Sequence, residues 1–515
     1  MDTLAKLHLL KVCIIVSAVL LLLAFRFRER NPAWRPWLNG CLALLALVSV
    51  FAYFDFGQYP KFGRFLNPHD FFHYYLGSKY SHEVGYVDLY PAVLVADAEN
   101  NGGKSSHNRL RSMETYRFVP AKQVLSQKEK YKGLFTTDRW YSFRADVKVF
   151  QGLLGPQRWG AVLVDKGYNA TPIWNMVARV LSSAFPAQNL SPLMLLDLGL
   201  LAAMFALVGW AFGGRTLLFA VIFFGTLFPM AYTHIRGAFL RLDWVTLLVM
   251  GLSLIKKERY KTAGACMAYA GAARIFPTVF VFGLGAKFLV DTLRKRRLER
   301  RYFGFFAAFG ATAAILLGMS VLVDGGLGPW REFFAKIHLH DNDLSPIRVG
   351  FRYVFLWTDG NPFGQWGPFE AAKLQFWNDH QTLWWMIQAV VLLLSLGIVQ
   401  RLEDYESVAY SYALAYFLFA PTFYYHVMLL VALFLFLPKA ASWPRLAGTV
   451  WLFLVSAILF VLNRRWALDL QLSFSMSILL LLASASMMLA GGVAPPAIAA
   501  APASAAKPAP KHRKR

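Results

Sequence analysis

The segment KKERYKTAGACMAYAGAARIFPTVFVFGLGAKFLVDTLRKRRLERR, residues 256–301, decides how this chain is folded. It begins and ends in strongly basic clusters, and such clusters favour the cytoplasmic side of a membrane. The apolar run between them, 262–291, measures about 45 Å as a helix, which is enough for one tilted crossing but not for two of about 30 Å. We therefore expect a broken hairpin. Its tip, residues 273–277, contains a proline that interrupts the helix, and it places Arg274 at membrane depth.

A second segment shows the same pattern. Residues 408–438 form an apolar run of similar length between two charged clusters, and we expect them to be interrupted at Ala420-Pro-Thr-Phe-Tyr-Tyr-His426. Interrupted spans with polar residues at the break are where membrane proteins commonly build binding sites. Functional residues are therefore expected at these two breaks and in the outer loops beside them.

The composition is that of a membrane protein. Of 515 residues, 57% are hydrophobic and 16% are charged, and the mean hydropathy is +0.42, which is too apolar for an ordinary soluble enzyme. The formal net charge is +24, but the basic residues occur in short clusters between apolar runs, as orientation signals do, so we expect no nucleic acid partner. All three cysteines lie in apolar segments, so neither a disulfide framework nor a cysteine metal site is suggested.

The apolar runs and charge clusters predict an all-α polytopic membrane protein with about thirteen crossings, with the N-terminus outside and the C-terminus in the cytoplasm. The expected divisions are two N-terminal transmembrane helices (1–56), a large and partly helical extracytoplasmic loop (57–190), a transmembrane bundle (191–323) containing the broken hairpin 262–291, a second extracytoplasmic loop (324–382), C-terminal transmembrane helices (383–490) containing the broken hairpin 408–438, and a disordered basic cytoplasmic tail (491–515).

The first outer loop opens with acidic, imidazole and phenol groups. In FLNPHDFFHYYLGSKY, residues 65–80, we expect Asn67 to cap a helix and Pro68 to begin it, which places Asp70 in the first turn. Helical spacing then puts four residues on one face: Asp70, His73, Tyr74 and Gly77. The simpler interpretation is that Asp70 only stabilises the start of the helix.

The expected topology gathers several polar groups on one side of the membrane: Asp70, Arg274 and His426 at the two breaks, and residues 338–352 of the second loop. A charged site at the outer surface fits a lipid-linked phosphate, because guanidinium groups bind phosphate while apolar spans hold the lipid. Simpler interpretations are that Arg274 extends to the membrane interface and that His426 is an ordinary interfacial histidine.

Two further clusters have a simpler interpretation than a metal or catalytic site. The first has metal-ligand side chains whose spacing matches no strong motif, so we expect no metal: His338, His340 and Asp341. The second lies in a short outer turn and is expected to form a local ion pair: Arg236, Arg241 and Asp243.

Five separated motifs resemble those of a known family. They are Asp70-Phe-x-x-Tyr74 with Gly85 and Leu89-Tyr90, Tyr168-Asn-Ala-Thr-Pro-Ile-Trp174, the glycine-rich Gly264–Pro277, Asn342-Asp-Leu-Ser345, and the break Ala420–His426. Together they cover most of residues 57–440 and resemble the GT-C polyprenyl-phosphate-sugar-dependent glycosyltransferases, particularly the branch containing bacterial mannosyltransferases. The chain differs from that pattern at Arg236-Gly237, where many relatives have Gly-Gln, at Arg274, where lysine is usual, and in an insertion over 95–165.

The resemblance implies a GT-C-like bundle that transfers one sugar, a mannose-like hexose or a pentose, from a polyprenyl-phosphate donor to a lipid, glycan or protein acceptor, with inversion at the anomeric carbon. It implies action on the extracytoplasmic face of the plasma (inner) membrane, with membrane lipids and the lipid-linked donor as partners and no cofactor. The implied site residues are Asp70 as general base with His426, Arg274 with Arg348 or Arg352 at the donor phosphate, and His73, Tyr74, Tyr90, Tyr168 and Asn342 at the sugar or acceptor.

Elementary chemistry agrees with this role for Asp70. A carboxylate at the membrane boundary can take the proton of an acceptor hydroxyl, and a phosphate leaving group is already ionised at neutral pH. A transporter or flippase for lipid-linked saccharides is an alternative, since such proteins also use broken helices and interior charges. A ligase for diphosphate-linked oligosaccharides and a non-catalytic scaffold are further alternatives. The chain has no convincing internal repeat, and an acceptor site accounts better for the large polar first loop. Both observations favour the transferase.

Overall fold

The computed structural model describes residues 2–28, 31–231, 235–342, 344–356, 366–466 and 470–493. Within these residues the chain is helical apart from one short β-hairpin, and eight helices are long and apolar enough to cross a membrane. These are α1 (Thr3–Arg28), α2 (Arg35–Tyr53), α10 (Ser191–Phe212), the η2–α15 segment (Phe276–Lys295), α16 (Arg300–Val323), α20 (Gln381–Val399), α23 (Trp443–Asn463) and α24 (Leu470–Gly492). The protein is therefore a multi-pass membrane protein.

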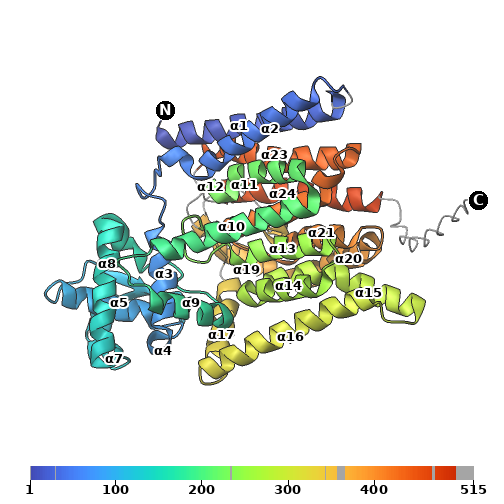
Figure 1. Cartoon of the computed structure of the whole chain (residues 1–515). Helices are drawn as coiled ribbons and strands as arrows, with labels where there is room; N and C mark the ends of the chain where they lie inside the picture. Colours follow the sequence, from blue (N-terminus) through green and yellow to red (C-terminus); the bar gives the residue numbers. More distant parts are fainter. Residues whose placement is uncertain are drawn as a thin grey trace, which may run out of the picture.

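Shorter helices complete the bundle. They are α11 (Gly214–Thr226), α12 (Phe228–Ala231), α13 (Asp243–Lys256), α14 (Tyr260–Arg274), α21 (Asp404–Leu418), α22 (Leu429–Phe436) and the 3-10 segments η2 (Phe276–Val281), η3 (Phe423–Met428) and η4 (Leu437–Lys439), with α15 itself covering Phe282–Lys295. The bundle helices run roughly alongside one another (Figure 1).

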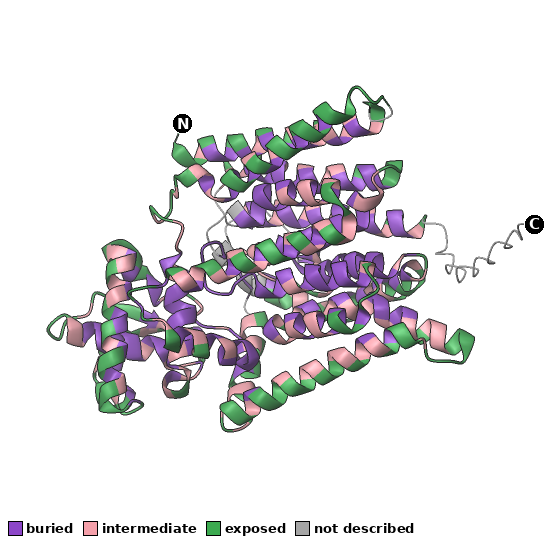
Figure 2. Cartoon of the chain, in the orientation of Figure 1, coloured by how far each residue is buried: buried purple, intermediate pink, exposed green. Residues whose placement is uncertain are grey.

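The middle of the bundle is formed by α21 and α22. Every residue of α22 is buried, whereas only 6% of the residues in the apolar stretch of α16 are buried. Helix α16 lies at the edge of the bundle (Figure 2). Apolar side chains on such an outer helix are expected to face lipid. Helix α14 packs closely on α16 at Gly264, where a Cβ atom would meet the Phe305 carbonyl oxygen at 2.3 Å. Small residues of this kind allow close helix packing in membranes.

A helical domain, which we call the projecting domain, extends from one end of the bundle (Figure 1). It comprises η1 (Asp55–Gly57), α3 (Pro68–Lys79), α4 (Ser81–Val84), α5 (Leu89–Asn100), β1 (Arg109–Arg111), β2 (Phe118–Pro120), α6 (Ala121–Leu125), α7 (Lys128–Lys132), α8 (Thr137–Val162) and α9 (Pro172–Ala184). The two strands are antiparallel, with Leu110 opposite Val119. Helix α17 (Gly328–Asn342) packs against α9, and α18 (Phe351–Phe355) and α19 (Trp366–Asp379) follow it.

Both expected helix breaks are present. Helix α14 ends at Arg274, Ile275 has a positive φ of +59°, and a 3-10 turn containing Pro277 follows. Helix α21 ends at Leu418, and η3 begins only after the Ala-Pro-Thr segment. A proline lacks the backbone N–H needed inside a helix, which accounts for the interruption in each case.

Candidate active site

Helix α3 carries the candidate base, Asp70. The Asn67 side chain accepts a hydrogen bond from the Asp70 amide at 3.1 Å and Pro68 is the first helical residue, which confirms the predicted helix start. The Asp70 side chain is 6% exposed. The positive end of the helix dipole favours a carboxylate there, but a carboxylate this deeply buried also needs a charged partner.

Arg241 is that partner. Its Nε lies 3.1 Å from Asp70 Oδ1, and its guanidinium stacks on the Tyr74 ring with Cζ 4.0 Å from the ring centroid. The side chain is 4% exposed, and within the described part of the chain its Nη1 is buried without a hydrogen-bond partner. A buried donor without an acceptor is costly, so the arrangement favours an anion bound beside this guanidinium.

The loop before α13 holds Arg241 in position through its backbone. Asp197 of α10 accepts a hydrogen bond from the Arg241 amide at 2.9 Å, and the Asn67 amide donates to the Gly237 carbonyl at 2.8 Å. Gly237 has a φ of +64°, and a Cβ atom there would meet the Phe65 carbonyl oxygen at 1.9 Å. The loop can approach the start of α3 this closely only because residue 237 is glycine.

A cavity of about 500 Å³ lies beside Asp70 and Arg241. This volume is typical of ligand-binding pockets. Its walls come from α3, the segment before α9, the loop before α13, α17 with the residues that follow it, and both helix breaks. The charged side chains that line it are Lys61, Asp70, Asp165, Lys166, Arg241 and Arg348. The cavity thus joins the first loop of the protein, the second loop and the two interruptions.

Burial controls the ionisation of this site. It raises the pKa of Asp70 to about 6, although the charge of Arg241 and the Phe239 amide oppose the shift. Burial also lowers the pKa of His340 to about 3, assisted by the nearby charge of Arg348. At neutral pH the cavity therefore contains an ionised Asp70 and an uncharged His340.

Arg274 lies behind the loop before α13 and is not one of the residues lining the cavity. Its guanidinium Cζ is 5.3 Å from the centroid of the Trp174 ring, and Nη2 donates to the Leu240 carbonyl at 3.4 Å. Its charge still acts on the site, because it lowers the pKa of Asp70. The guanidinium thus contacts protein groups of α9 and of the loop before α13.

The second break pairs with the segment after α17. The Val349 amide donates to the Pro421 carbonyl at 3.0 Å, and the Phe423 amide donates to the Ile347 carbonyl at 3.1 Å. This pairing places Arg348 in the cavity wall, where its guanidinium also contacts the His340 carbonyl. The interruption of the helix therefore supplies backbone groups that position a cation.

His426 forms hydrogen bonds that stabilise the second break, and it does not line the cavity. Its side chain is fully buried, Nδ1 lies 3.0 Å from the Tyr412 hydroxyl, and Nε2 lies 3.1 Å from the Val349 carbonyl. Both ring nitrogens are thus occupied by protein groups. Arg352 is also outside the lining: its Nη1 is 3.5 Å from Asp341 Oδ2, and its Cζ lies 4.0 Å from the Trp377 ring centroid.

The expected sugar-binding residues divide into two groups. His73 and Tyr74 line the cavity. The other three make contacts elsewhere: the Tyr90 hydroxyl is 2.7 Å from His73 Nε2, the Tyr168 hydroxyl donates to Asn175 at 2.7 Å, and Asn342 Nδ2 is 3.1 Å from His338 Nε2. Tyr90 and Tyr168 are buried and support the cavity wall from behind.

Sequence reasoning missed Arg241 as a site residue. It assigned Arg241 to a local ion pair with Asp243, but Arg241 contacts Asp70, and Asp243 accepts a hydrogen bond from the Tyr269 hydroxyl at 3.0 Å. Arg236 pairs with Asp55, with Nη1 2.9 Å from Oδ1. Nearness in sequence was the wrong signal, because both arginines find carboxylates that lie far away along the chain.

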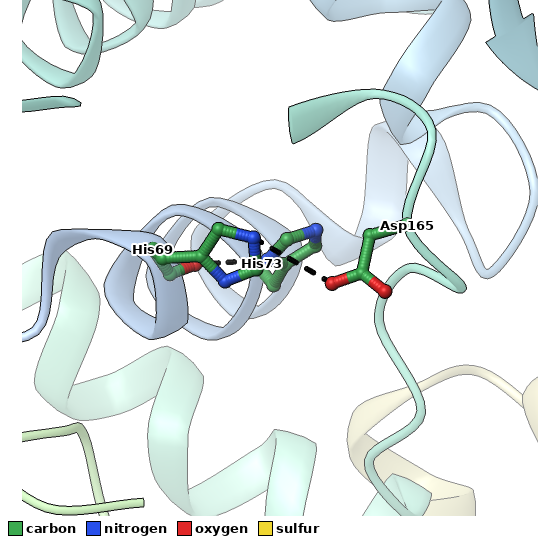
Figure 3. A group of neighbouring side chains, drawn as sticks. All are labelled: His69, His73 and Asp165. Carbon is green, nitrogen blue, oxygen red and sulfur yellow. Dashed lines mark hydrogen bonds and ion pairs between the residues drawn. The ribbon is translucent and has the colours of Figure 1, made fainter. Parts of the chain in front are cut away.

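Three neighbouring side chains in the cavity wall are of metal-ligand type: His69, His73 and Asp165 (Figure 3).

No protein-family model, curated protein or solved structure matches the chain.

Proposed function

We propose that the protein is an integral membrane glycosyltransferase of the GT-C type that moves one sugar from a polyprenyl-phosphate donor to an acceptor hydroxyl. The observation that carries this proposal is the buried Asp70–Arg241 pair at the edge of the cavity. It offers a carboxylate that can accept a proton, next to a guanidinium with an N–H still available to an anion within the described structure. Guanidinium groups are well suited to phosphate.

In the proposed reaction the acceptor oxygen bonds to the anomeric carbon while the bond from that carbon to the phosphate oxygen breaks. The acceptor proton passes to Asp70, as in general base catalysis. The electron pair of the broken bond stays on the lipid phosphate, where Arg241 and Arg348 stabilise the charge. Arg274 adds to this positive field from behind the loop. The transition state is oxocarbenium-like, and inversion at the anomeric carbon follows from a single displacement.

The proposed membrane arrangement places this cavity on the extracytoplasmic side of the plasma membrane. It adds α11, α13, α14, α21 and the η3–α22 segment to the eight long helices, which gives about thirteen crossings; α14 and α15 are the arms of the first broken hairpin, and α21 and α22 are those of the second. The basic clusters at 256–261 and 294–301 are then cytoplasmic, as the distribution of lysine and arginine favours. The lipid tail of the donor lies along the bundle, and the acceptor, a lipid, glycan or protein, approaches from the projecting domain.

The test uses purified protein in lipid nanodiscs and a panel of polyprenyl-phosphate sugars, with release of free polyprenyl phosphate as the readout. We expect Asp70→Asn to slow release by about 10²- to 10⁴-fold, the usual contribution of a general base. Turnover by this variant at the wild-type rate would exclude Asp70 as the base. Movement of the donor across vesicle membranes without release of lipid phosphate would support the transporter instead.

Asp138→Asn is the matched control. Asp138 also lies in the first turn of a capped helix of the projecting domain, α8, but it is exposed and outside the cavity lining. If Asp70 only stabilised a helix start, both substitutions would leave the turnover of the folded protein unchanged. We expect Asp138→Asn to retain wild-type turnover.

A further inference from the structure

Helix α3 presents two histidines to the cavity that the proposed reaction does not use as acid or base. His69 and His73 are four residues apart and share one face of the helix, with their ring centroids 4.9 Å apart. Asp165, in the segment between α8 and α9, approaches them so that one ligand atom of each of the three residues lies within 4.8 Å of the others (Figure 3). All three residues line the cavity that contains Asp70.

We propose that His69, His73 and Asp165 bind one divalent first-row transition cation, with zinc as its simplest representative. Two imidazoles and one carboxylate suit zinc and its neighbours, whereas magnesium and calcium prefer sites built from oxygen ligands. Three protein ligands leave a further coordination position. That position faces the cavity and can take water or an oxygen of a bound ligand.

The hydrogen bonds of His73 prepare it for this role. Its Nδ1 lies 2.9 Å from the His69 carbonyl oxygen, which can only accept, so Nδ1 carries the proton. Nε2 then has the free electron pair, which in this structure accepts from the Tyr90 hydroxyl at 2.7 Å. A backbone carbonyl that fixes the tautomer of a metal-binding histidine is a common arrangement. On metal binding the Tyr90 hydroxyl has to leave this electron pair to the cation, and it keeps its hydrogen bond to the Gly167 backbone.

The separation between His69 and Asp165 requires only a small adjustment. Ligand atoms around a tetrahedral zinc ion are about 3.3–3.6 Å apart, given bonds of about 2.0–2.2 Å. His69 Nε2 and Asp165 Oδ2 already lie 3.6 Å apart. The Asp165 side chain is half exposed, so its carboxylate can turn toward the two histidines. A movement of about 1 Å brings the three ligand atoms to bonding positions.

Binding of the cation does not depend on sugar transfer, so this proposal and the proposed function can fail separately.

The experiment measures zinc bound to the full chain, purified in detergent with a tag that contains no histidine and treated with a chelator. Equilibrium dialysis against Zn²⁺ is expected to give one equivalent per chain, and Co²⁺ in its place is expected to give the visible absorption bands of a four-coordinate nitrogen and oxygen site. Less than a stoichiometric amount of bound zinc, or displacement of zinc by equal concentrations of Mg²⁺ or Ca²⁺, would overturn the proposal.

Variants then locate the site. His69→Ala and Asp165→Asn change partly or largely exposed side chains, and each is expected to weaken zinc binding at least tenfold while the protein stays folded. His338→Ala is the control, because His338 is exposed and is not among the three clustered residues. Equal zinc affinity in the wild type and in both site variants would contradict the assignment, and loss of binding in His338→Ala alone would place the cation elsewhere.

Discussion

Replacing Arg241 by lysine tests the site most directly, because the change keeps the positive charge beside Asp70 and removes two other features. The planar group that stacks 4.0 Å from the Tyr74 ring centroid is lost, and so is the Nη1 donor that has no partner in the described structure. The stack on Tyr74 is already present in the free protein, so its loss, about 2 kcal/mol, lowers stability. The charge-assisted hydrogen bond to the donor phosphate contributes about 1.5–3 kcal/mol, which corresponds to a loss of roughly 10- to 150-fold in kcat/KM.

The assay is the initial rate of polyprenyl phosphate release from a radiolabelled lipid-phosphate sugar by protein in nanodiscs, at several donor concentrations. If Arg241 contacts the donor phosphate in both the ground state and the transition state, KM rises and kcat falls together. A kcat/KM for Arg241→Lys within about threefold of the wild type would refute the assignment of this guanidinium to the donor phosphate.

Arg352→Lys is the matched control for this measurement. Arg352 is also buried, also lies near a carboxylate, and also stacks with Cζ 4.0 Å from an aromatic ring centroid, that of Trp377. It lies outside the cavity lining. A loss of stability from replacing a stacked arginine would therefore affect both variants, whereas a loss of catalysis should affect only Arg241→Lys.

Two other predictions concern stability. Asp55 lies 2.8 Å from Lys11 Nζ and 2.9 Å from Arg236 Nη1, so Asp55→Asn leaves two buried cations unpaired and should lower the unfolding free energy by about 3–5 kcal/mol. Lys11→Met leaves a one-to-one pair and should be nearly neutral. Equal denaturation curves of these two variants in detergent would contradict the prediction. Burial lowers the pKa of Lys336 to about 7. The unfolded chain therefore binds the extra proton between pH 7 and pH 10, and stability should rise by about 2–3 kcal/mol from pH 7 to pH 9 in the wild type, but not in Lys336→Met, as measured by the difference between their melting temperatures.

The features that could be predicted from the sequence are those determined by neighbouring residues. Asn67 and Pro68 begin α3 because a cap and a first-turn proline act within one turn of helix. The two breaks follow from prolines in apolar runs that are too long for one crossing and too short for two. The membrane class follows from eight long apolar helices whose composition is visible without coordinates.

The features that could not be predicted depend on contacts between distant segments. The break at 420–426 was expected to expose His426 to a ligand, yet Tyr412 and the Val349 carbonyl occupy both of its ring nitrogens. The position of a break follows from local chemistry, but the direction of a side chain depends on which helix packs beside it. For the same reason the pairing of Arg241 with Asp70 has no local signal.

Three carboxylates from different parts of the chain hold the loop that carries Arg241. Asp55 binds the Arg236 guanidinium, Asp197 accepts from the Arg241 amide, and Asp70 contacts the Arg241 guanidinium. Only Asp70 lines the cavity. Two buried carboxylates are thus used to fix the backbone of a loop that presents one cation, although each is costly to bury. That cost is understandable if the cation must meet developing charge without rearranging, since a group fixed in advance stabilises a transition state better than one that must first be ordered.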